Sequence, residues 1–498
     1  MSLKAYDYIL TWLSVFWPEG REDIEEFARN SRVSPETATH LTGRKITWTA
    51  LNPFVNVETG HLVRAIVAVG QNRAKLTDAY AALQAKERAT GYIDPEKQRI
   101  ELDKLKSAMP IVTNPLHWQE FIHSIKIAGF ADRRGITSTT NLISTYILFL
   151  LGRNRFNVKL DKLRPLIARW FFMSQLTSRY TGSGETQLQK DLDRLGGVGV
   201  KDADGFVRAL DDAIANELTA DFWTYRIPDS LVTSSQALSP SYQCYLAALN
   251  TLGAELFMIR MPVSQWMDPS MPAIKGMEAH HLFPRKYQEN VLGTTDLKRI
   301  NQAANFAPTD WDTNIFISDR PPAEYWADLV KQRAGDDEEW LAKQRYWHAL
   351  PTGWEQLDYD EFLSKRRKLI AQVVRDGFHK IGTYAGPVAQ TPTAEGIVRE
   401  ELPPEGEWTI AALIEAGVLR VGDNLDPVHG APQDAAVTED ATLRLTDAEG
   451  RTEEFDSLDA AARYLGFPNV VGLDFWVLDD NPDMPLGELL TRATASAG

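Results

Sequence analysis

Two adjacent histidines and two later asparagines are the residues of this sequence whose types and spacing point most clearly to chemistry. The segment EAHHLFPRKY, at positions 278–287, contains His280 and His281, and a downstream apolar run contains Asn305, followed nine residues later by Asn314. Histidine can act as a general base that activates water, asparagine can hold that base in its working tautomer, and a His and Asn pair can bind a divalent cation. A one-metal phosphodiesterase requires these groups to hydrolyse a nucleic-acid backbone.

The same residues stand in a longer pattern. The histidines open the run HHLFP, Asn305 and Phe306 lie in a short strand-like segment, and NIFISDRPPAEY closes the region from Asn314 to Tyr325. The region resembles the HNH, or ββα-metal, nuclease motif, and more narrowly the C-terminal nuclease domain of GmrSD-type modification-dependent restriction endonucleases. A pair of packed, hydrogen-bonded histidines is the alternative interpretation, and the conjunction of the three sequence features favours the nuclease.

The resemblance implies a role for each of the four residues. His281 is expected to be the general base and Asn305 the residue that orients it. His280 is expected to be a metal ligand, with Asn314 as the second residue on the metal side. The implied cofactor is Mg²⁺ or Mn²⁺.

Three further residues are candidates near this motif. Glu278 lies two residues before His280, on the same side of a strand, and is expected to be either an additional ligand or a solvated glutamate. His348 and Arg366 follow the motif and could approach the scissile phosphate, although a surface position is the favoured interpretation for both.

The elements that must position the motif are mainly helical. Residues 1–240 contain apolar residues at three- and four-residue spacings, and two segments, NPLHWQEF and IARWFFMSQLTSRYTGSGETQ, resemble the helical middle portion of the same restriction family. We therefore expect a mainly α, multidomain protein with a ββα-metal nuclease core and a small α+β domain at its C-terminal end. The expected order is a helical domain (1–240), a nuclease domain with trailing helices (241–384), a linker (385–406), the small domain (407–484) and a tail (485–498).

The small C-terminal domain resembles the RAMA domain that accompanies restriction and methylation systems. The likeness rests on LIEAGVLRVGD, SLDAAA and the Gly-x-x-Phe-Trp run from Gly472 to Trp476. It implies recognition of modified DNA, with Trp476 either stacking on an extruded base or packing in a core. Docking to another protein, or covering of the nuclease surface, is the alternative role.

Charge divides the chain at the expected linker. Residues 385–498 contain 22 acidic and 6 basic residues, whereas residues 1–384 carry a net charge of +1, which together give the −15 of the whole chain. A net negative domain is electrostatically unsuited to phosphate contact. The near-neutral first 384 residues can still present a local basic face, for which 152–164, 285–288 and 366–375 are candidates, and solvated helix faces are the alternative interpretation of these runs.

Cysteine content and hydropathy indicate the compartment in which the protein is expected to occur. Cys244 is the single cysteine, so the chain cannot form the zinc site of two Cys pairs that many HNH enzymes use, and a reducing compartment is favoured. The N-terminal apolar run contains Asp7 and lacks a small-residue cleavage site. The run from Leu142 to Gly152 is about half the length that would cross a bilayer. We expect a soluble, cytoplasmic protein.

The overall prediction is a metal-dependent endonuclease that cleaves DNA, in particular modified phage DNA, in a GmrSD-like restriction system. Members of that family commonly begin with a ParB-like nucleotide-hydrolysing domain, which is absent here together with any GxxxxGK[ST] phosphate loop. That domain is expected either on a separate partner polypeptide or in a segment missing from the start of the chain. The alternatives are a catalytically idle scaffold that binds DNA or a partner, and an RNA-cleaving toxin with the same motif.

Overall fold

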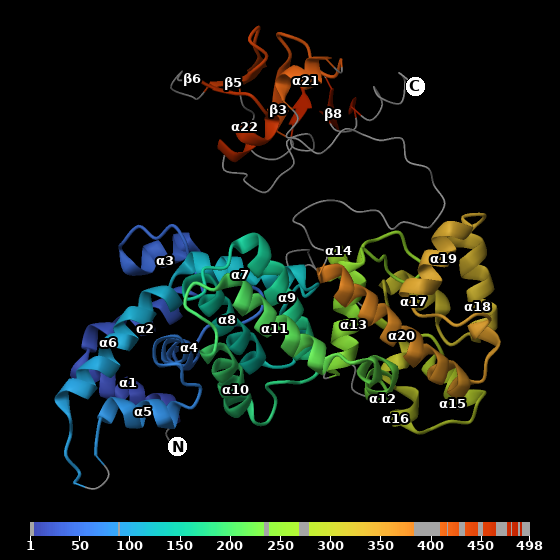
Figure 1. The fold of residues 1–498 in the computed structure, drawn as a ribbon. Helices are drawn as coiled ribbons and strands as arrows, with labels where there is room; N and C mark the ends of the chain where they lie inside the picture. The colour runs from blue at the N-terminus through green and yellow to red at the C-terminus, as the bar shows by residue number, and fades with distance from the viewer. Residues whose placement is uncertain are drawn as a thin grey trace. The chain divides into compact units, whose positions relative to one another are not determined.

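Helices account for most of the structure, as the sequence patterns predict, with 64% of the residues in helices and a small antiparallel sheet near the C-terminus (Figure 1). The computed structural model divides into two units, residues 1–389 and 390–498. It describes residues 4–87, 90–233, 239–267, 278–382, 409–415, 417–427, 434–446, 452–464, 476–479, 481–486 and 489–490. The predicted linker at 385–406 lies outside the described residues.

The first unit consists of helices joined by short connections. In chain order they are α1 (Ala5–Phe16), α2 (Pro18–Asn30), α3 (Pro35–Thr42), α4 (Thr59–Gln71), α5 (Leu76–Gln84), α6 (Pro95–Val112), α7 (Pro115–Ile127), η1 (Arg133–Gly135), α8 (Thr139–Asn154), α9 (Leu160–Leu176), α10 (Gly184–Gly196), α11 (Ala203–Glu217), η2 (Phe222–Arg226), α12 (Ile227–Ser230), α13 (Pro240–Thr251), α14 (Val263–Met267), α15 (Arg285–Asn290), α16 (Leu297–Ile300), η4 (Ala303–Asn305), α17 (Trp311–Ile317), α18 (Pro322–Leu329), η5 (Val330–Ala334), α19 (Glu338–Trp347), η6 (Trp354–Gln356) and α20 (Tyr359–Gly382).

Several of these helices begin where the sequence places a capping residue before a proline. Asp94 accepts hydrogen bonds from the amides of Glu96 and Lys97 at the start of α6, whose first residue is Pro95. Asn114 caps α7 in the same way. Proline fits the first helical position because its missing N–H has no partner there in any helix. The dipeptides Asp94-Pro95 and Asn114-Pro115 therefore mark the starts of α6 and α7.

The apolar segment from Leu142 to Gly152 forms the centre of the first unit. It belongs to α8, whose residues from Asn141 to Gly152 are all buried, and α8 packs against α4, α7 and α9. A helix that is apolar on all sides must be enclosed by other helices in a water-soluble fold. Among the described residues, no helix is both long enough and apolar enough to cross a membrane.

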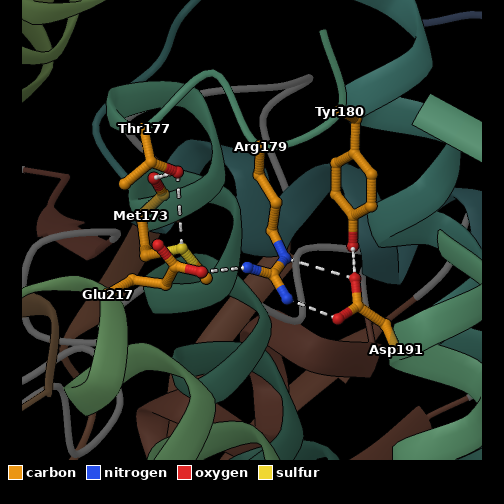
Figure 2. Close-up of polar contacts among 6 residues, drawn as sticks. All are labelled: Met173, Thr177, Arg179, Tyr180, Asp191 and Glu217. Atoms are coloured by element: carbon orange, nitrogen blue, oxygen red, sulfur yellow. Dashed lines mark hydrogen bonds and ion pairs between the residues drawn. The ribbon is translucent and has the colours of Figure 1, made fainter. Parts of the chain in front are cut away.

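A charged cluster lies where α9, α10 and α11 meet (Figure 2). The guanidinium of Arg179 pairs with the carboxylates of Asp191 and Glu217, and the hydroxyl of Tyr180 donates to Asp191 at 2.7 Å. The side chains of Arg179 and Asp191 are only 5% and 1% exposed. Arg179 and Tyr180 belong to the SRYTGSGETQ part of the sequence, and the cluster ties the end of α9 to the two following helices through mutually compensated charges.

The second unit contains the antiparallel sheet, which has the strand order β6-β5-β4-β3-β7-β8. Its elements are α21 (Ile410–Glu415), β3 (Asn424–Pro427), β4 (Asp434–Val437), β5 (Leu443–Thr446), β6 (Thr452–Phe455), α22 (Leu458–Tyr464), β7 (Trp476–Leu478) and β8 (Asn481–Pro485). The unit has a hydrophobic core of its own, to which both helices and the strands contribute. A small C-terminal unit with helices and a sheet is what the sequence predicts.

Trp476 is part of that core. Its side chain is fully buried, and its indole N–H donates to the carbonyl of Leu458 at 3.2 Å. A buried ring cannot stack on an extruded base, so the role of Trp476 in base recognition is wrong and its interpretation as a core residue is confirmed.

Candidate active site

The two adjacent histidines lie on the first strand of a short hairpin. Strand β1 (Glu278–His281) pairs antiparallel with β2 (Phe306–Thr309), so that His280 lies opposite Ala307 and His281 opposite Phe306. Directly after β2, Asp310 caps α17 by accepting a hydrogen bond from the amide of Thr313. The hairpin of β1 and β2 thus brings β1 into contact with α17, which begins 30 residues after β1 ends.

His280 and Asn314 meet at the junction of β1 and α17. Nδ1 of His280 donates a hydrogen bond to Oδ1 of Asn314 at 2.7 Å. Burial lowers the pKa of His280 to about 4, although the hydrogen bond to Asn314 opposes this effect. The histidine is therefore neutral at pH 7, and its second nitrogen, Nε2, has a free lone pair.

That nitrogen is buried and has no hydrogen-bond partner in the part of the chain that the structure describes. A buried polar atom without a partner costs about 1–3 kcal/mol unless a water molecule or an ion satisfies it. Metal-ligating histidines have this arrangement, in which one ring nitrogen donates to an oxygen and the other is left for the metal. The structure thus brings His280 and Asn314 together, but Asn314 lies on the Nδ1 side of the ring, away from Nε2, so it orients the histidine and its expected role as a second ligand is wrong.

His281 is held by an asparagine that the sequence analysis did not single out. Nε2 of His281 donates to Oδ1 of Asn301 at 2.8 Å, and the ring packs on Phe306 with centroids 4.2 Å apart. This contact fixes the tautomer in which Nδ1 has the lone pair. Burial lowers the pKa of His281, the contact with Asn301 raises it, and the charge of Arg285 lowers it. The imidazole is therefore favoured in the neutral form that a general base requires.

Asn305 does not take the part that the resemblance gives it. Its fully buried side chain accepts from the amide of Phe283 at 2.9 Å and donates to the carbonyls of Phe283 and Ile300 at 3.1 and 3.0 Å. It therefore joins the backbone after β1 to the end of α16, and the direct partner of the base is Asn301, four residues earlier. The run NQAAN offers two asparagines, and the sequence pattern alone does not distinguish the one that reaches the ring.

The expected surface position of His348 and Arg366 is wrong, because both side chains are fully buried. The guanidinium of Arg366 donates to the carbonyls of His348, Ala304 and Phe306, and Nε2 of His348 donates to the carbonyl of Glu255. Arg366 thus fastens α20 to the segment that leads into β2. Neither residue is free to contact a phosphate in this arrangement.

Two other residues of the motif have positions that bear on its geometry. The hydroxyl of the buried Tyr325 donates to the carbonyl of Leu282, next to His281, and its ring lies edge-on to that of His280. Glu278 is paired through its backbone position with Thr309, and its side chain lies outside the described residues. Over the described residues, no group of three or more His, Cys, Asp and Glu side chains is placed to hold a metal ion. Nε2 of His280 is a buried donor without a partner among the described residues.

The segment between the two strands is exposed and basic. Lys286 and Lys298 are exposed and form no ion pair with any described residue, whereas Arg285 pairs with Glu289 on α15. The connection between α15 and α16 also exposes Val291 and Leu292. Asn301 directly follows α16, so Lys298 lies about 4.5 Å along the helix axis from the residue that contacts His281.

The comparisons with known proteins give no name to this arrangement. Neither the protein-family models, nor the curated proteins, nor the solved structures contain a match to the chain.

Proposed function

We propose that the chain is a metal-dependent endonuclease of the HNH type that hydrolyses phosphodiester bonds in DNA. The observation that carries the proposal is the pair of contacts His280–Asn314 and His281–Asn301 on adjacent residues of one strand. Each contact fixes one imidazole in a tautomer with one free lone pair. Two neutral histidines with different free nitrogens suit two different tasks, proton transfer and metal binding.

His281 acts as the general base in this proposal. Its Nδ1 accepts a proton from a water molecule, which attacks the phosphorus atom, and Asn301 stabilises the imidazolium that forms. Phe306 and the hydrogen bond to Asn301 hold the ring in place during the transfer. Asn305 and Tyr325 act through the backbone, because they hold the residues that follow His281.

His280, through Nε2, would hold Mg²⁺ or Mn²⁺, and Asn314 would fix the orientation of the ring by accepting the hydrogen bond from Nδ1. The fit rests on the unpartnered Nε2 of His280 and on the donation of its other ring N–H to an oxygen. When bound, the cation would neutralise charge on the phosphate and on the leaving oxygen. Protein donors are few at this site, which suits Mg²⁺, an ion that keeps several waters.

The exposed cations between the strands support a nucleic-acid substrate. Lys286 and Lys298 lie on the segment that leads to Asn301, where they can neutralise phosphates on either side of the scissile bond. The finer assignment, to modified DNA in a cytoplasmic GmrSD-like restriction system with a ParB-like partner subunit, rests on the sequence resemblance alone. An RNA-cleaving enzyme with the same site, or an idle scaffold, is the alternative.

Cleavage assays with the purified chain test this proposal. The substrates are plain, hydroxymethylated and glucosylated DNA and an RNA of the same sequence, each with Mg²⁺ and with EDTA. We expect His281→Ala to lower turnover by about 10²- to 10⁴-fold, whereas His123→Ala, which removes an exposed histidine of α7, leaves it unchanged. Full activity in EDTA, or an unchanged rate in folded His281→Ala, would falsify the mechanism, and RNA cleavage alone would favour the alternative substrate.

A further inference from the structure

A groove of about 660 Å³ lies between the π-helical turn η2 and the long helix α20. This volume is within the range of about 300–1,000 Å³ that small-molecule sites occupy. Short π-helical turns are rare and occur frequently at functional sites. The groove has two walls of different chemistry, and none of the residues at the candidate active site lines it.

Aromatic side chains form the wall on η2. Trp223 is almost fully buried at the base of the groove, where its ring lies 6.0 Å from that of Phe378. Tyr225, two residues later, is 63% exposed, so its ring face is available to a ligand. An exposed aromatic ring next to a fixed one gives a planar ligand a surface on which to stack.

Hydrogen-bond donors form the wall on α20. Lys368, Gln372 and Arg375 are exposed and are spaced by four and three residues, which places them on one face of the helix. Lys368 has no ion-pair partner among the described residues. Asp376, the acidic member of the lining, already accepts a hydrogen bond from the hydroxyl of Tyr346 at 2.7 Å. This wall therefore favours an anionic ligand.

The groove and the candidate active site use different sides of α20. Arg366, which fastens the helix to the hairpin, and Arg375 are nine residues apart, which is two and a half turns. They therefore point to opposite faces, and Arg375 lies about 14 Å further along the axis. A ligand in the groove is thus distinct from the phosphate that His281 would attack.

We propose that this groove binds a nucleotide unit, with its base stacked on Tyr225 and its phosphate held by Lys368 and Arg375. Base-on-aromatic stacking combined with cations along one side is the pattern by which proteins hold unpaired nucleotides. A purely apolar ligand would leave the donors of α20 without partners. The ligand is either a nucleotide within a single strand or a free nucleotide, since both present the same base and phosphate.

Binding to the full-length chain in EDTA tests the groove without depending on cleavage, so that the outcome is separate from the nuclease proposal. The probe is a fluorescein-labelled single-stranded octathymidylate, followed by fluorescence anisotropy, and unlabelled thymidine monophosphate is the competitor. We expect Tyr225→Ser and the double variant Lys368→Gln/Arg375→Gln each to weaken binding by about tenfold or more. The double variant should also reduce the dependence of affinity on salt.

Two matched controls separate the groove from general surface effects. Tyr92→Ser removes a tyrosine that is 62% exposed on another part of the first unit, and Lys365→Gln removes a lysine of α20 that does not line the groove. Competition by the monophosphate identifies a free nucleotide as a ligand, and binding of the oligonucleotide alone identifies a strand. Unchanged binding in both groove variants, or equal losses in the controls, would overturn the proposal.

Discussion

At the residue scale, two asparagines four positions apart have different tasks next to His281. Asn301 touches the ring, whereas Asn305 touches only the backbone around it. The first contact bears on proton transfer, and the second bears on the stability of the hairpin. Substitution of each by alanine therefore has different expected consequences.

Asn301→Ala is expected to lower the rate of cleavage by about tenfold, which corresponds to one hydrogen bond of about 1.4 kcal/mol. Because Asn301 raises the pKa of His281, its loss should also shift the acidic limb of the pH–rate profile to lower pH. Asn305→Ala instead leaves the buried amide of Phe283 without its partner and removes two further hydrogen bonds, which should destabilise the protein by about 1–3 kcal/mol. Rate profiles and urea unfolding distinguish the two, and an unshifted profile in Asn301→Ala would remove its role at the base.

His348 gives the stability of the first unit a dependence on pH. Burial, together with the charge of Arg366, lowers the pKa of His348 to about 3. The unfolded chain, in which the histidine titrates near pH 6.5, binds the extra proton first, so this contribution to stability is present above that pH and is lost as the pH falls towards 3.

Between pH 7 and pH 5 the wild-type chain should therefore lose about 2 kcal/mol more than His348→Gln, which cannot titrate. Urea unfolding of both chains at the two pH values measures the difference. Parallel losses in the two chains would show that His348 titrates normally.

At the scale of the elements, buried charges hold helices together at two places. Arg366 joins α20 to the carbonyls of Ala304, Phe306 and His348, and Arg179 joins the end of α9 to α10 and α11 through two carboxylates (Figure 2). The two cations are compensated differently. Backbone carbonyl dipoles surround Arg366, whereas the carboxylates of Asp191 and Glu217 surround Arg179.

Removal of Asp191 from the ion pairs of Arg179 should strongly lower the stability of the first unit. Asp191→Leu leaves the buried guanidinium of Arg179 without its main partner, and a loss of about 3–5 kcal/mol in the free energy of unfolding is expected. The control is Glu339→Gln, which breaks an exposed pair with Lys343 and should change stability by less than about 1 kcal/mol. Similar small effects of both substitutions in urea unfolding would contradict the structural role of the cluster.

At the scale of the whole molecule, the second unit carries all of the net negative charge. Residues 390–498 have the same 22 acidic and 6 basic residues as the region beyond 384, because positions 385–389 are uncharged. Since Trp476 is buried in the core of this unit, base stacking by that ring is not available to it. The negative charge of the second unit is expected to repel the phosphates of DNA.

Deletion of residues 390–498 changes the formal charge from −15 to +1. We expect the shortened chain to bind plain DNA more tightly at low salt, with the gain fading as the Debye length falls from about 10 Å at 0.1 M to 3 Å at 1 M. Affinities for plain and modified DNA across salt concentrations measure this effect. Loss of the preference for modified DNA without a gain on plain DNA would instead support recognition of the modification by the second unit.

The sequence by itself determined the helical character of the chain, because helix patterns and caps such as Asn114-Pro115 act over a few residues. It also determined the division of charge, which follows from composition along the chain. Local patterns are sufficient for these two features, whereas the pairing of His280 with Asn314 was expected only from a resemblance.

Only the tertiary structure decided which side chains reach one another across the hairpin. Asn301 and not Asn305 contacts His281, since Asn301 ends α16 next to the ring, whereas Asn305 ends η4 with its amide bonded to the backbone. Arg366 and His348 are hydrophilic in sequence yet fully buried, because carbonyls brought from distant segments satisfy them. The groove along η2 and α20 likewise joins residues more than 130 positions apart, and long-range packing of this kind has no local signature in the sequence.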